Sequence, residues 1–384
     1  MSRHSTDRPG REVTGPLDGV RVVEPAGIGP GPFAAMVLAD LGADVVRVDR
    51  PGASPLGGDP AHDVTNRNKR SVVIDLKSPE GPRTVRALTA RADILVEGDR
   101  PGVAERLGVG PEECLAVILA LVYGRMYGWG RRGPLASLAG HDIGCIATAG
   151  ALSMIGTPDG QPVPPVNLLG DYAGGSLHLT TGVLAALLTA RATGRGQVVD
   201  AAIVDGTAHL TTMFWGMLAE GIWRDARGRT LLDGGCPSYG VHETADAGWM
   251  AVGALEPQFH AVFVSLLGLD TEDLPDRADP HNRPALRAEF TARFKMATRT
   301  EWTAALEGTD ACVAPVLSLH EAAGHRRLAG RGTCTEAYGI TQPAPTPRFS
   351  AIPGTLRLPP AVPGAHTPDL ARDRDVPELL KDHR

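Results

Sequence analysis

The sequence of 384 residues is poor in cysteine and has no cysteine spacing typical of a disulfide framework or a metal site. It contains five cysteines, which is an odd number, and none of them form a C-x-x-C pair. In a chain of this length, such usage indicates reduced thiols, a cytoplasmic location and no metal ligation by cysteine.

The chain also lacks long apolar runs and an excess of positive charge. Its first fourteen residues, MSRHSTDRPGREVT, are polar and contain no apolar stretch of the kind found in secretory signals. The longest apolar run, Leu115 to Val122, is far too short to cross a bilayer. A net charge of −6 gives no general reason to expect nucleic-acid binding. We therefore expect a soluble protein without a membrane or nucleic-acid partner.

Strand and helix signals alternate through the first hundred residues. β-branched runs such as DVVRVD are typical of strands, and the apolar stretches between them are typical of helices. The expected strands are residues 20–24, 44–49, 71–75 and 94–96, and the expected helices are 33–41 and 79–91. This alternation predicts an α/β fold with a doubly wound, Rossmann-like parallel sheet.

The second half of the chain has a different pattern of expected elements. Long helices are expected at 174–193 and 200–220, followed by turn-rich hairpin strands and helices at 257–267 and 284–294. A proline-rich stretch at 338–360 is expected to lie extended over the first domain. The predicted parts are a disordered N-terminus (1–14), a large Rossmann-like domain (15–225), a small α+β domain (226–330) and a C-terminal return segment (331–384).

Glycines at 27, 29 and 31 follow the first expected strand and leave a nicotinamide dehydrogenase as one alternative. Asp49 lies about twenty residues further on, where a ribose ligand would stand in a dinucleotide-binding motif. However, the pattern G-x-G-x-x-G needs its third glycine at position 32, which is occupied by Pro32. The fit to a dinucleotide site is therefore imperfect.

His141 and Asp171 form a candidate acid/base pair. They lie thirty positions apart, and each follows a glycine and opens an expected helix. The positive end of a helix and its free N–H groups can hold a developing oxyanion, which suits proton transfer next to a carbonyl. On the residues alone, however, a helix N-cap is the better interpretation of Asp171.

Six motifs extend the analysis over nearly the whole chain: GRMYGWG, AGHDI, GALSMIG, PPVNLLGD, GRGQVVDAAIVDG and VGALEPQF. In content and order they resemble the α-methylacyl-CoA racemases within the family III CoA-transferase (CaiB/BaiF-like) superfamily. The resemblance covers roughly residues 15–366. It implies an interlocked homodimer and an acyl-CoA substrate.

The resemblance implies racemisation at the α-carbon of a 2-methyl-branched acyl-CoA. His141 and Asp171 would be the two bases, and Glu256 would orient the imidazole and raise its basicity. Asp142 would help to organise the thioester carbonyl. No metal, nicotinamide or flavin cofactor is required for this reaction.

Four basic residues match positions on the CoA-binding side of the family: Arg50, Lys69, Arg70 and Arg100. Taken alone, such residues are mostly solvated loop charges. The resemblance implies that they bind the phosphates of CoA, for which arginine forks and a lysine charge are suitable donors.

The chain departs from the family pattern near the expected acyl pocket. Gly144 and Cys145 stand where a polar and an aromatic residue are usual, and CPSYG carries Ser238 and Gly240 in place of bulkier residues. Tyr127 replaces a small hydroxyl residue. The pocket residues expected on this basis are Tyr127, Cys145, Ser238 and Tyr239. The lost aromatic side chains predict room for a bulky acyl group.

Two further functions stay open. In a family III CoA-transferase, Asp171 would be a nucleophile that forms an acyl anhydride. His141 and Glu256 argue against this reaction, because a transferase needs neither. A non-catalytic CoA-ester-binding protein is the other alternative, although it would have little reason to keep all three acid/base residues.

Overall fold

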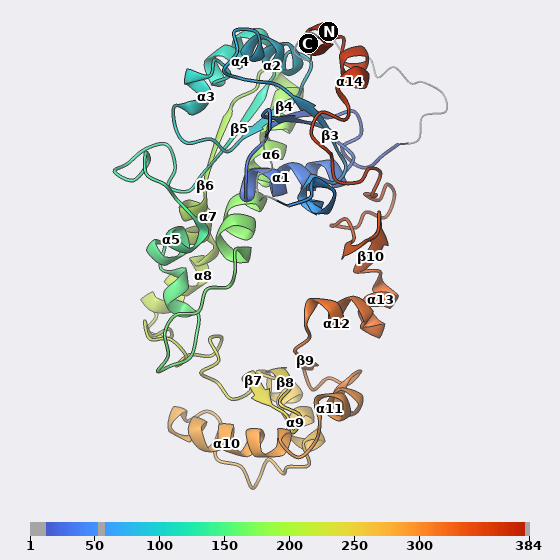
Figure 1. The fold of residues 1–384 in the computed structure, drawn as a ribbon. Coiled ribbons are helices and arrows are strands. Elements are labelled where there is room, and N and C mark those ends of the chain that lie inside the picture. Colours follow the sequence, from blue (N-terminus) through green and yellow to red (C-terminus); the bar gives the residue numbers. More distant parts are fainter. Residues whose placement is uncertain (1–12, 53–57, 381–384) are drawn as a thin grey trace. The chain divides into compact units, whose positions relative to one another are not determined.

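The computed structural model describes residues 13–52 and 58–380 (Figure 1). The chain divides into two compact units. Unit 1 comprises residues 1–149, 166–210 and 326–384, and unit 2 comprises residues 150–165 and 211–325. Most of the expected disordered segment, residues 1–14, lies outside the described residues.

Unit 1 is built on a six-stranded parallel sheet in the order β3-β2-β1-β4-β5-β6. The strands are β1 (Arg21–Pro25), β2 (Asp44–Asp49), β3 (Lys69–Val73), β4 (Ile94–Glu97), β5 (Val122–Tyr127) and β6 (Val198–Ala202). The order runs outward in both directions from β1 and β4, which is the doubly wound arrangement that the sequence predicts. The expected fold class is thus confirmed.

Helices cover both faces of this sheet because neighbouring side chains of a strand point to opposite faces. Val22 and Val45 pack with α1 (Pro30–Asp40) and α6 (His178–Thr193). Their neighbours Val23 and Val46 pack on the other face. The helices of that second cluster include α2 (Gly81–Thr89), α3 (Val103–Arg106), α4 (Pro111–Val117) and α14 (Thr367–Asp373).

The helix that ends in α6 begins as a π-helix, η4 (Leu168–Leu177). The N–H of Tyr172 donates to the carbonyl oxygen of Asn167 at 3.4 Å, an i to i−5 bond. Glycine permits a close approach to α7 (Ile203–Leu210), since a Cβ on Gly206 would lie 1.7 Å from the carbonyl oxygen of Gly174. The run Leu168–Thr193 is long and apolar enough to cross a bilayer, but half of it is buried, as in a core helix.

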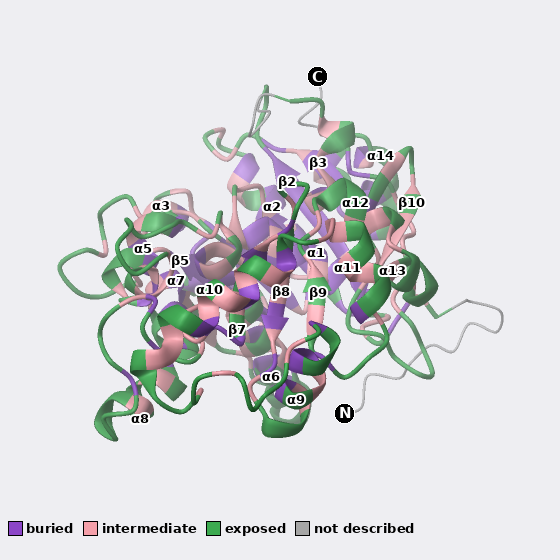
Figure 2. Cartoon of the chain, turned by 90° about the horizontal axis from the view of Figure 1, so that it is seen from below, coloured by how far each residue is buried: buried purple, intermediate pink, exposed green. Residues whose placement is uncertain are grey.

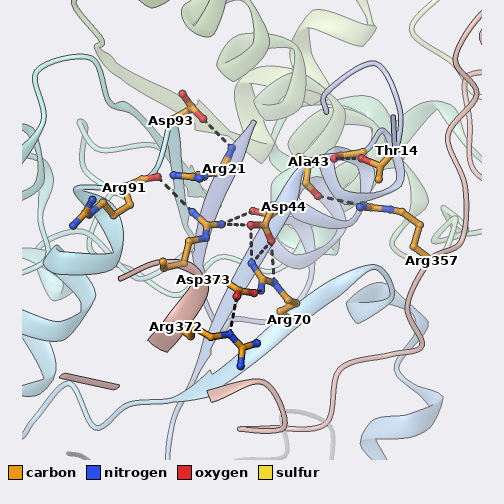
Figure 3. A network of polar contacts seen from close by, with 12 residues as sticks. Thr14, Arg21, Ala43, Asp44, Arg70, Arg91, Asp93, Arg357, Arg372 and Asp373 are labelled. Carbon is orange, nitrogen blue, oxygen red and sulfur yellow. Dashed lines mark hydrogen bonds and ion pairs between the residues drawn. The ribbon is translucent and has the colours of Figure 1, made fainter. Parts of the chain in front are cut away.

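The C-terminal segment packs on the rest of unit 1. Arg67 donates to Asp40 at 2.6 Å and to Gln342 at 2.9 Å, and the amide N–H of Arg357 donates to Asn68 at 2.6 Å. This segment contains α13 (Arg326–Arg331), β10 (Cys334–Ala337), β11 (Ile340–Pro343) and α14. Its polar contacts with β2 and β3 are drawn in Figure 3.

Unit 2 contains an antiparallel sheet of β7 (Tyr239–Glu243), β8 (Trp249–Gly253) and β9 (Val313–Pro315). Its core is built around the side chains of Phe263, Phe290 and Phe294. The helices of this unit include α8 (Thr212–Ala219), α9 (Pro257–Leu266), α10 (Arg283–Phe294), α11 (Arg299–Leu306) and α12 (Leu319–Gly324). Figure 2 shows that β2 and β3 of unit 1 are mostly buried, whereas α8 is mostly exposed.

One expected element is wrong. The helix expected over 200–220 begins instead as the strand β6, and its helical part is divided at Thr211 into α7 and α8. Val198–Ala202 pairs in register with β5, so tertiary pairing decides the conformation there.

Candidate active site

His141 and Asp142 lie at the start of α5 (Asp142–Thr148), as the sequence predicts. His141 is the N-cap residue, with extended backbone angles (φ −113°, ψ 158°), and its side chain is exposed. Asp142 is the first residue of the helix and is buried. The imidazole is therefore accessible to a substrate, whereas the neighbouring carboxylate points into the protein.

Asp171 lies in η4, and three elements converge on it. Its backbone N–H donates to Oδ2 of Asp142 at 2.7 Å. Its side-chain Oδ2 accepts a longer bond of 3.3 Å from the amide of Asn167. Gly29, in the loop after β1, adopts φ +75°, and a Cβ there would lie 3.0 Å from Oδ2 of Asp171. The carboxylate thus lies against the loop that follows the central strand β1.

The surroundings of Asp171 strengthen it as a base. Burial raises the pKa of its carboxyl, the hydrogen bond from Asn167 lowers it, Asp142 raises it again, and His141 lowers it. The net change is upward. A carboxylate with a raised pKa is a better general base than an ordinary aspartate.

This position is the crevice of a doubly wound sheet. The loops after β1 and β4 leave the sheet side by side, where the strand order reverses. Ligands of such sheets bind outside the carboxyl ends of the strands at this point. Arg50, directly after β2, and Arg100, after β4, are exposed at the same edge. Both remain candidates for phosphate binding.

Lys69 and Arg70 have internal partners instead. Lys69 is fully buried, with Nζ 2.7 Å from Oε2 of Glu24 and 2.9 Å from the carbonyl oxygen of Pro32. Arg70 forms a two-pronged contact with Asp44, at 2.7 Å and 2.8 Å, at the opposite edge of the sheet (Figure 3). Both cations thus already have carboxylate partners within the protein, which argues against the expected role of Lys69 and Arg70 in binding the CoA phosphates.

The surroundings of Asp49 argue against the dinucleotide-binding alternative. Asp49 is 1% exposed, and its two carboxylate oxygens contact Arg47 at 3.0 Å and Ser71 at 2.6 Å. Because it is buried as well as paired, its carboxylate is not accessible to a ribose hydroxyl.

Two of the expected pocket residues are core residues of unit 1. Cys145 is fully buried, and its thiol donates to the carbonyl oxygen of Gly128 at 3.4 Å. Burial raises the pKa of this thiol to about 11, and the carboxylates of Asp142 and Asp171 add to the shift. Tyr127 is 4% exposed and directs its hydroxyl toward Glu97, 3.4 Å away. Neither residue opens additional space for an acyl group.

A buried ionic cluster that was not expected from the sequence lies beside Tyr127. Arg125 of β5 donates to Glu97 at 2.8 Å and to Glu105 at 2.9 Å, and its side chain is fully buried. Burial raises the pKa of Glu97 to about 7 even though Arg125 lowers it. The signal in the sequence is a charged residue within each of two apolar strands, ILVE and VYGRMY.

In unit 2, Ser238 and Tyr239 point to different surroundings. Ser238 is buried, and its hydroxyl lies 3.1 Å from Nδ1 of His260, whose pKa is lowered to about 4 by burial. Ser238 therefore belongs to the interior and not to a pocket. Tyr239 and Gly240 line an apolar groove of about 380 Å³ on the sheet, together with Cys312.

Glu256 is the N-cap residue of α9 in unit 2. Arg277 donates to the carbonyl oxygen of Leu255 at 3.0 Å and so fixes the preceding turn. Burial raises the pKa of Cys312, and the carboxylate of Glu256 raises it further. Its pairing with His141, a residue of unit 1, stays a prediction.

Comparison with known families decides the class of this site. The model of CoA-transferase family III matches residues 17–367. The chain belongs to this family. The resemblance seen in the motifs is thus confirmed.

Among its relatives in the family, two of high identity are racemases by name, whereas others, such as a mouse succinyl-CoA:glutarate CoA-transferase at 29% identity, are transferases by name. A mouse (Mus musculus) protein called alpha-methylacyl-CoA racemase is 43% identical over 361 residues, which cover 93% of each chain. The human (Homo sapiens) protein of the same name is 42% identical over 363 residues, again with 93% of each chain covered. The crystal structure of a CaiB/BaiF family protein from Brucella suis matches with a TM-score of 0.82 and 26% identity, over 94% of this chain and 100% of that one.

Proposed function

We propose that this protein is an isomerase that interconverts the 2R and 2S forms of 2-methyl-branched acyl-CoA thioesters. The observation that carries the proposal is the placement of Asp171, a half-buried carboxyl with a raised pKa, near His141 at the crevice of the sheet. The identity of 43% to a named racemase supports the same reaction.

The reaction needs two groups on opposite faces of the α-carbon. The α-proton of a thioester is weakly acidic, so its removal requires a positioned base and stabilisation of the enolate oxygen. Asp171 takes the proton from one face, the C–H electron pair moves into the enolate, and protonated His141 returns a proton to the other face. The roles are reversed for the opposite enantiomer. Each positioned acid/base group contributes about 10²–10⁴-fold.

Three further residues complete the proposed site. Glu256 would bind one nitrogen of His141 and fix its tautomer. Arg50 and Arg100, both exposed at the carboxyl ends of strands, would bind the CoA phosphates. The reaction transfers only protons, so the proposed chemistry uses no metal or redox cofactor.

We propose further that the protein is a homodimer. The helix α8 exposes the large apolar side chains of Trp215 (65%) and Met213 (53%), and contiguous apolar surface is typical of protein interfaces. A second copy of the chain would cover it, and folding and association would then be coupled. Light scattering should give twice the mass of the chain at micromolar concentration. A stable and active monomer would contradict this proposal.

The test of the reaction is incubation with each pure enantiomer of a 2-methylacyl-CoA in deuterated water. A racemase introduces deuterium at the α-carbon and destroys optical purity from either starting form. The rival CoA-transferase, which the family model also covers, would pass CoA to a free carboxylic acid and leave the α-hydrogen in place. Transfer without exchange would therefore overturn the proposal.

A further inference from the structure

The surroundings of Asp142 are unusual for a carboxylate that only organises a substrate carbonyl. The residue is 7% exposed, and Oδ2 accepts the backbone N–H of Asp171 at 2.7 Å. The other oxygen, Oδ1, is buried and has no hydrogen-bond partner among the described residues. A neutral acceptor would satisfy the N–H equally well, whereas a buried unpartnered carboxylate oxygen costs free energy.

The neighbouring turn is shaped to admit this carboxylate. A Cβ on Gly170 would lie 2.4 Å from Oδ2 and 2.8 Å from Cγ of Asp142. Any larger residue at position 170 would push the carboxylate away from the N–H of Asp171. The close approach therefore depends on glycine immediately before Asp171.

The negative charge of Asp142 affects two nearby titratable groups, Asp171 and Cys145. It raises the pKa of the Asp171 carboxyl and that of the Cys145 thiol. His141 and the amide of Asn167 act on Asp171 in the opposite direction. None of the other titratable side chains on the elements that pack against η4 contributes to the shift of Asp171; these are Asp40, Tyr123, Arg125, Tyr127, His178, Arg191, Asp200, Asp205 and His209.

We propose that Asp142 is a positioning residue that fixes Asp171 through its backbone N–H and, by its negative charge, keeps Asp171 a stronger base. The role rests on the proposed racemisation, in which Asp171 removes the α-proton. A base gains directly from a nearby like charge, because its affinity for the proton rises.

The two parts of this role are separated by two substitutions. Asp142→Asn keeps an oxygen that can accept the N–H of Asp171 but removes the charge. Asp142→Ala removes both. In the Asn variant, the acidic limb of kcat/KM for racemisation should move to lower pH, because Asp171 then loses its proton more readily. The plateau rate should fall roughly threefold to tenfold, and the Ala variant should lose more.

A titration that does not depend on activity keeps this inference separate from the proposed function. The carboxyl of Asp171 can be followed by ¹³C NMR in the whole protein, with and without Asp142→Asn, after circular dichroism has shown that the fold is kept. A lower pKa of Asp171 in the variant supports the inference even if no racemisation is found. An unchanged pKa overturns it even if the wild-type enzyme racemises.

If Asp142→Asn does not fold, Gly170→Ala gives a second test. This substitution displaces the Asp142 carboxylate without removing its charge from the protein. The pKa of Asp171 should change and the racemisation rate should fall. An unaltered titration of Asp171 in a folded Gly170→Ala protein would contradict the proposed role.

Discussion

Unit 1 buries carboxylates in two different ways. Glu24 is fully buried against Lys69, and Asp40 is bound by Arg67 and by Asn68 at 2.7 Å. Asp171 forms no such ion pair with any of the residues that the structure describes; its side chain receives one amide hydrogen bond, and the carboxylate of Asp142 accepts its backbone N–H. Charges that hold the fold are neutralised, whereas the charge at the candidate site is left poorly compensated. Perturbed and poorly compensated groups of this kind are typical of catalytic sites.

The largest effect should follow from removal of either base. Asp171→Ala and His141→Ala should each reduce racemisation by about 10²–10⁴-fold, because each removes one proton-transfer group. Binding of the CoA ester should persist, since the phosphate contacts lie elsewhere. Chiral chromatography of the product and a direct binding measurement check the two statements. Near-normal racemisation by His141→Ala would contradict the assignment of His141 as one of the two bases.

The carboxylates that are paired with cations should matter for stability and not for catalysis. Lys69→Met leaves the buried carboxylate of Glu24 without its cation and should lower the free energy of unfolding by about 3–5 kcal/mol. Asp171→Asn should change it by less than about 1 kcal/mol, or increase it, since no cation is lost. Urea unfolding measures both variants. Equal destabilisation by the two substitutions would remove the distinction between structural and catalytic carboxylates.

A smaller effect is expected at the carboxyl edge of the sheet. Arg50→Ala and Arg100→Ala should each raise KM for the acyl-CoA roughly tenfold through loss of a charged contact, with little change in kcat. Arg70→Ala is the matched control, because that guanidinium is bound to Asp44 at the other edge. Steady-state kinetics measure KM for the three variants. An increase in KM for Arg70→Ala alone would show that Arg70, and not Arg50 or Arg100, binds the CoA phosphates.

The smallest effect concerns the pH dependence of stability at Glu97. Its pKa in the folded protein is raised from 4.5 to about 7, chiefly by burial. The folded state therefore holds more protons than the unfolded state between these pH values, and the contribution of Glu97 to stability falls as the pH rises through that window. Glu97→Gln should flatten this part of the profile of unfolding free energy against pH. A steeper fall of the unfolding free energy with pH in Glu97→Gln would contradict the expected contribution of Glu97.

Much of the fold follows from local sequence pattern. The strand expected at 44–49 has the same bounds in the structure, because DVVRVD is β-branched and buried on both faces. The strands β5 and β6 are not predicted by local pattern. VYGRMY contains a glycine and an arginine, and the arginine is buried only because Glu97 and Glu105 meet it there. That compensation is a tertiary property.

The candidate site shows the same division. The positions of His141 and Asp142 at a helix start could be predicted, because glycine and a small-residue run surround them. The contact between Asp142 and the N–H of Asp171 joins residues 29 positions apart and depends on a π-helical turn. Lys69 was expected to be exposed before a strand, but the strand begins at Lys69 itself and carries its side chain into the core. Burial of this kind is fixed by packing and cannot be read from local composition.

The most direct test of the account is α-proton exchange in the single-base variants. With His141→Ala in deuterated water, Asp171 should still exchange the α-proton of one enantiomer, which keeps its configuration, while the other enantiomer stays unlabelled. Asp171→Ala should show the opposite preference. Exchange of both enantiomers at similar rates in either variant would contradict a mechanism with one base on each face of the α-carbon.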